Sequence, residues 1–67
     1  MNKKIDQILN NCISLRKDNN ITQLDIAKKH NIELHNIVNF ENGKTHNYKY
    51  LIMYHNIDKN IDLFKGV

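Results

Sequence analysis

Residues 34–42 carry side chains that could read the edges of DNA bases. The Asn39 amide can donate to and accept from one adenine edge at the same time, and His35 can donate to or accept from a base edge. Leu34 and Val38 can pack against a thymine methyl group. Because this stretch holds no Arg, the commonest guanine contact is missing, and any bound duplex is expected to be A·T-rich.

A helix over residues 34–42 would turn these groups outward. At about 100° per residue, Ile37 and Phe40 share one side of such a helix, while His35 and Asn39 lie opposite. The apolar side is the one expected to pack against the rest of the chain.

The histidines and the single cysteine do not form a metal-binding or catalytic pattern. Their spacing is too wide for a zinc knuckle, and no base can be identified beside the thiol. The residues concerned are His30, His35, His46, His55 and Cys12. We therefore expect no enzyme activity, no metal site and no cofactor.

Apolar periodicity predicts an all-α fold in a single domain over residues 1–67. Apolar residues at steps of three and four mark a first helix from about Asn2 to Asn19. Further helices are expected from Thr22 to about His30, over residues 34–42, from about Asn47 to Asn56, and as a last turn from about Ile61 to Lys65.

Capping residues support these boundaries. Thr22 with Asp25 three residues later fits a capping box, and Asn47 is a good N-cap for the fourth helix. Asn31 is expected to take the left-handed conformation in the turn after the second helix. Gly43 is expected to take it after the third.

The run TQLDIAKKHNIELHNIVNFENGKT, from Thr22 to Thr45, resembles the lambda-repressor/Cro (Xre-type) family of helix-turn-helix regulators. The resemblance rests on threonine-glutamine opening a helix, alanine five residues after Thr22, and Glu41-Asn42-Gly43-Lys44 closing the unit. It is strong through this run and looser afterwards. It implies a compact five-helix lambda-repressor-like DNA-binding domain, with the helix-turn-helix at about residues 22–42, in a phage or bacterial repressor that occupies an operator.

The resemblance also implies roles for particular residues. It places DNA base contacts at Leu34, His35, Val38 and Asn39, and phosphate contacts at Gln23, Asn36, Asn42, Lys44, Thr45 and His46. It pairs Arg16 with Glu41, which would lock the first helix to the end of the third. Arg16 is the only arginine, and a planar guanidinium suits a two-point grip on a carboxylate better than lysine does.

The segment over residues 57–67 is the expected dimer contact. The resemblance implies a homodimer on an A·T-rich pseudo-palindromic operator, with the interface at Ile57, Ile61, Leu63 and Phe64. Burial in the core is an equally open reading of Leu51, Tyr54, Ile57 and Phe64.

Composition adds weaker expectations. The formal net charge of +3 favours a polyanionic partner only mildly, because it also serves solubility. A single cysteine, short apolar runs and a polar start predict a cytoplasmic protein with no membrane partner. Two alternatives stay open: a protein-binding module that uses Leu24, Leu34 and Val38, and an antitoxin that binds both a toxin and its own operator.

Overall fold

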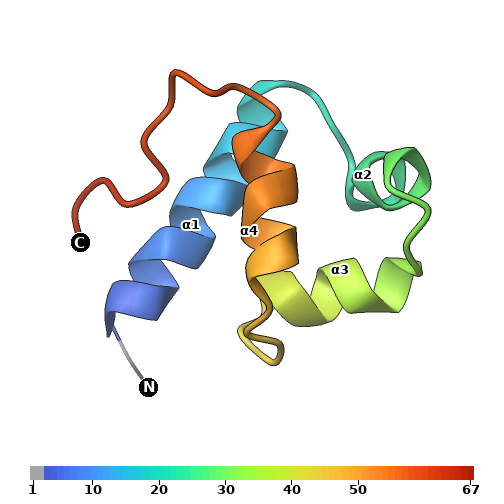
Figure 1. The fold of residues 1–67 in the computed structure, drawn as a ribbon, viewed down its shortest axis with the longest axis horizontal. Coiled ribbons are helices and arrows are strands. Elements are labelled where there is room, and N and C mark those ends of the chain that lie inside the picture. The colour runs from blue at the N-terminus through green and yellow to red at the C-terminus, as the bar shows by residue number, and fades with distance from the viewer. Residues whose placement is uncertain (1–2) are drawn as a thin grey trace.

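Residues 3–67 fold into four helices joined by short loops, and the prediction of an all-α fold is confirmed. The computed structural model describes residues 3–67, so Asn2, the predicted start of the first helix, lies outside the described residues. In Figure 1, α1 and α4 lie side by side, α3 runs along one edge of the molecule, and α2 stands beside α3. The bounds are α1 Lys3–Asp18, α2 Gln23–Lys29, α3 Leu34–Glu41 and α4 Tyr48–His55.

The fifth helix predicted over residues 61–65 is wrong, because this part of the chain forms turns. Two aspartates explain the difference. Asp58 Oδ1 accepts the backbone N–H of Asn60 at 3.0 Å, and Asp62 Oδ1 accepts that of Phe64 at 2.9 Å. Such local side-chain bonds offer the backbone an alternative to the helical ladder. We call residues 58–67 the C-terminal segment.

The core lies where the four helices meet, and one residue of the C-terminal segment completes it. The α1 residues Leu9, Cys12 and Leu15 are spaced at one helical turn, so they present one stripe to the other helices. The remaining core residues are Ile26 and Ala27 from α2, Ile37 and Phe40 from α3, Tyr50, Met53 and Tyr54 from α4, and Leu63.

The predicted caps are present where the helices begin and end. Asp25 N donates to Thr22 Oγ1 at 3.0 Å and Thr22 N donates to Asp25 Oδ2 at 2.9 Å, which completes the capping box of α2. Asn31, with φ 54°, and Gly43, with φ 77°, both take the left-handed conformation. Asn47 Oδ1 accepts the backbone N–H of Lys49 and caps α4.

Candidate nucleic-acid interface

Two short helices and a four-residue turn position the residues that could read bases. Ile32 N donates to the carbonyl of Ala27 at 2.9 Å, so the turn closes directly onto the end of α2. Ala27 and Ile37 are buried and bring α2 and α3 together through their apolar sides. The turn and these buried side chains hold the start of α3 against α2.

The four residues expected to contact bases share one side of α3. Leu34 and Val38 lie one turn apart, as do His35 and Asn39, whereas Ile37 is fully buried on the opposite side. Leu34 and His35 are exposed, and Val38 and Asn39 are half-buried. We call Leu34, His35, Val38 and Asn39 the outer face of α3.

His35 has one charged neighbour. Its Nδ1 lies 3.7 Å from Glu33 Oε2, and both side chains are largely exposed. An exposed pair of this kind contributes little to stability and exchanges readily with water. Glu33 therefore does not fix the orientation of the His35 side chain.

The residues expected to contact phosphates lie at the ends of the α2–α3 unit. Gln23 begins α2, Asn36 lies in the first turn of α3, and the others follow the end of α3. Asn42, Lys44 and His46 are exposed, whereas Gln23, Asn36 and Thr45 are half-buried. Gln23 differs from the rest because its amide Nε2 donates to Glu41 Oε1 at 3.1 Å, which leaves it one further N–H.

The expected ion pair between Arg16 and Glu41 is present and buried. Arg16 Nε donates to Glu41 Oε2 at 2.7 Å, and Arg16 Nη2 donates to Glu41 Oε1 at 3.0 Å. This is the two-point geometry that only a guanidinium provides. Arg16 Nη1 also donates to the carbonyl of Ile21 at 2.9 Å, so the same side chain ties the loop after α1.

Two further side chains, which the sequence pattern did not predict, donate hydrogen bonds to the Glu41 carboxylate. The Tyr54 hydroxyl donates to Glu41 Oε2 at 2.5 Å, and the Gln23 amide donates to Oε1. Each carboxylate oxygen therefore accepts two hydrogen bonds, and the donors come from α1, α2 and α4. We call Arg16, Gln23, Glu41 and Tyr54 the Glu41 network.

Electrostatics inside the Glu41 network favour the charged pair. Burial raises the pKa of Glu41, but the hydrogen bonds from Arg16, Tyr54 and Gln23 outweigh it and hold this pKa below its ordinary value. The hydrogen bond to Glu41 raises the pKa of Arg16, and burial followed by the bond to Glu41 raises the pKa of Tyr54. The carboxylate and guanidinium are thus both ionised at neutral pH.

The surface expected to form a dimer is only partly available. Leu63 is 3% exposed and belongs to the core, so its side chain is not accessible for the expected dimer contact. The physical reason is a clamp on α1: Asn11 Nδ2 donates to the carbonyls of Leu63 at 2.9 Å and Lys65 at 2.8 Å, and the Leu63 side chain turns inward. Ile57 is half-buried against the core, whereas Ile61 remains exposed.

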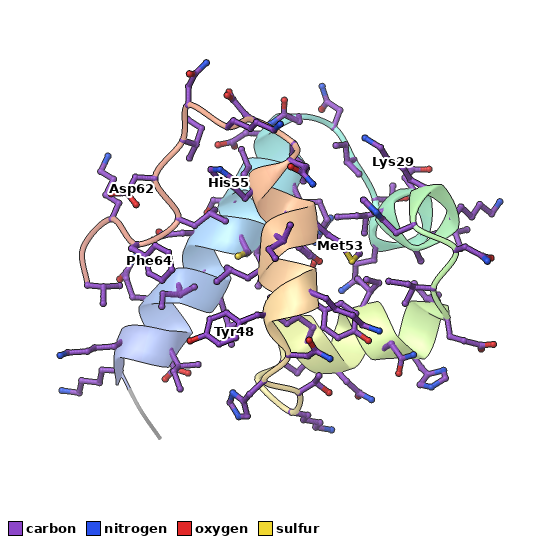
Figure 2. All side chains as sticks on the ribbon, viewed as in Figure 1. Lys29, Tyr48, Met53, His55, Asp62 and Phe64 are labelled. Carbon is purple, nitrogen blue, oxygen red and sulfur yellow. The ribbon has the colours of Figure 1, made fainter. Side chains whose placement is uncertain are left out.

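Phe64 joins an exposed apolar surface that includes α4. Phe64 is 52% exposed, so the alternative of core burial is wrong for it, while Tyr54 is fully buried as that alternative expected. Tyr48 and Ile52, 78% and 59% exposed, extend the surface along α4. Figure 2 shows Phe64 and Tyr48 on the same side of α4, with Met53 pointing the opposite way.

Two shallow hollows adjoin this apolar surface. The first, of about 220 Å³, lies between α1, α4 and the loop before α4, and the second, of about 260 Å³, lies between α4 and the C-terminal segment. Leu51 and Phe64 line both hollows. The surface therefore combines a protruding aromatic ring with depressions on either side of it.

The single cysteine lies in the core, apart from any grouping of side chains that could hold a metal ion within the described residues. Cys12 is buried, and burial together with the nearby Glu41 carboxylate raises the pKa of its thiol to about 12. No group of three or more His, Cys, Asp and Glu side chains within residues 3–67 is arranged to hold a metal ion. The described helices also include none with the length and apolar character needed to cross a membrane.

Comparison with known proteins gives no match to this chain, whether with family models, characterised proteins or solved structures.

Proposed function

We propose that this chain is a helix-turn-helix protein of the lambda-repressor/Cro type that binds double-stranded DNA sequence-specifically and regulates transcription by occupying an operator. In this proposal α3 enters the major groove with its first turns against base edges. The observation that carries the proposal is the division of α3 into two sides. Leu34, His35, Val38 and Asn39 share the outer face, while Glu41 at the end of the helix is anchored in a buried network.

The residues that follow α3 are suited to phosphate contacts, which would fix the position of the protein along the duplex. Lys44 and His46 are exposed directly after α3, and exposed lysines are common partners of phosphate oxygens. Asn42 and Thr45 add uncharged donors in the same stretch. These contacts would hold the duplex without reading its sequence, and they leave specificity to the outer face of α3.

A homodimer completes the proposal. A domain of this size buries little surface, and a two-fold pair would place two copies of α3 on one side of the duplex. The exposed apolar surface formed by Tyr48, Ile52, Ile61 and Phe64 is the region we assign to the contact between copies. This set replaces the one expected from the sequence, which included the buried Leu63.

Selection from randomised duplex DNA tests this function. We expect an A·T-rich pseudo-palindrome whose half-site centres lie roughly 34 Å apart, one turn of the duplex. Asn39→Ala should lose about 1–3 kcal/mol against the preferred base and relax the choice at that position. Lys44→Ala, the matched phosphate variant, should weaken binding to all sequences alike and reduce the slope of affinity against salt.

A protein partner is the second candidate, and one observation favours it. Leu24 and Leu34 are both exposed on the α2–α3 unit, and α3 holds no lysine or arginine. Exposed apolar side chains often mark a protein contact. Binding that persists at raised salt, with no consensus recovered from the selection, would favour this candidate. Co-purification of a neighbouring gene product together with operator binding would favour the antitoxin.

A further inference from the structure

The hydroxyl group of Tyr54 forms a hydrogen bond between α4 and the last residue of α3. Its side chain is 0% exposed, and its hydroxyl donates to Glu41 Oε2. Glu41 is the last residue of α3, so the bond acts at the end of the helix opposite to Leu34 and His35. A group buried in this way cannot touch DNA or any other ligand of the outer face.

The Glu41 carboxylate accepts four hydrogen bonds and has no acceptor position to spare. Arg16 supplies two of them, and Tyr54 and Gln23 supply one each. A carboxylate offers about four lone-pair positions. Because the donors lie on three different helices, the direction of the carboxylate is determined from three sides. Removing the Tyr54 hydroxyl releases the constraint from α4, while the ion pair between Arg16 and Glu41 remains.

We propose that Tyr54 is a positioning residue that sets the orientation of α3, and with it the outer face of α3, through its hydrogen bond to Glu41. The bond from Gln23 ties α2 to the same carboxylate, so the angle between α2 and α3 depends on the same group. The consequence for DNA reading rests on the proposed function, whereas the orientation of α3 does not.

Tyr50, the other buried tyrosine of α4, allows the effect of the Tyr54 hydrogen bond to be distinguished from the effect of ring packing. Both Tyr50 and Tyr54 are buried, and both rings pack against Phe40, with centroids 5.4 Å and 5.2 Å from it. Of these two tyrosines, Tyr54 is the one whose hydroxyl donates a hydrogen bond to Glu41. Tyr54→Phe and Tyr50→Phe therefore remove the same atom from the same helix beside the same ring, but only the first removes a bond to α3.

The test compares these two variants in solution with the full chain. Residual dipolar couplings of the backbone amides measure the orientation of α3 relative to α1 and α4. We expect the couplings of α3 to change in Tyr54→Phe and to remain as in the wild type in Tyr50→Phe. Unchanged α3 couplings in Tyr54→Phe, or equal changes in both variants, would overturn the positioning role.

The second measurement is the ratio of affinity for the selected operator to affinity for unrelated DNA. We expect Tyr54→Phe to lower this ratio on the order of tenfold, which corresponds to about 1.4 kcal/mol, and Tyr50→Phe to leave it within about twofold. A loss of stability alone would lower both affinities in proportion and leave the ratio unchanged, and that result would also refute the inference. A wild-type protein that selects no sequence would refute the proposed function, while the dipolar couplings would still decide the positioning of α3.

Discussion

The end of α3 and the C-terminal segment both pack near α1, but different forces hold them in place. Glu41 is buried and receives donors from α1, α2 and α4. The C-terminal segment contributes one buried side chain, Leu63, and its backbone is bonded to α1 by the amide of Asn11. One attachment is a buried charged network, and the other is a neutral clamp close to water.

The difference matters because the two kinds of attachment respond differently when one hydrogen-bonding partner is removed. A buried charge left without its partner keeps the full cost of desolvation, so the network favours one arrangement and strongly disfavours partial ones. A neutral bond near the surface can be exchanged for a bond to water, and regions with few buried contacts open locally at little cost. We infer that α3 is held rigidly, whereas the C-terminal segment opens more readily.

Breaking the ion pair should have the largest effect. Arg16→Ala leaves Glu41 buried without its main partner and should lower the free energy of unfolding by about 3 kcal/mol, a large share of the stability of a domain this small. Urea denaturation measures this change in the free energy of unfolding. Lys17→Ala, which removes an exposed charge from the next position of α1, is the control and should change stability by less than about 0.5 kcal/mol. An unchanged denaturation midpoint in Arg16→Ala would show that the network does not hold α3.

Acid should reduce the stability that the Glu41 network contributes, because the pKa of Glu41 is lowered in the folded protein. Burial alone would raise that pKa, but the hydrogen bonds from Arg16, Tyr54 and Gln23 bring it below the ordinary value of 4.5. The stabilisation is therefore fully present above the unfolded-state pKa and is lost as the pH falls through the folded-state pKa. Carbon-13 NMR of the Glu41 carboxyl group should show a midpoint below 4.5. A midpoint above that value would mean that burial outweighs the donors.

Releasing the clamp should have the smallest effect. Asn11→Ala removes the bonds to the carbonyls of Leu63 and Lys65, and it should cost about 1–2 kcal/mol. Hydrogen exchange should accelerate in residues 63–67 and remain slow in α3. Asn10→Ala, at an exposed position beside it, is the control. Equal loss of protection in α3 would show that the two regions are one cooperative unit.

The local features of the fold were predictable because their causes lie within a few residues. The apolar steps of α1, the Thr22–Asp25 capping box and the left-handed Asn31 and Gly43 all follow from nearby side chains and backbone preferences. The predicted fifth helix failed for a local reason as well. Hydrogen bonds from the backbone to the side chains of Asp58 and Asp62 compete with the helix that apolar spacing alone favours.

By itself the sequence determined the all-α class, the approximate positions of the four helices that form, the groups that share the outer face of α3, and, through the family resemblance, the pairing of Arg16 with Glu41. Only the tertiary structure decided that Tyr54 and Gln23 complete the network, and that Leu63 is buried while Phe64 is exposed. The physical reason is distance along the chain. Helical periodicity and caps act over three to five residues, whereas a hydrogen bond from Tyr54 to Glu41, or from Asn11 to Leu63, depends on how whole helices pack.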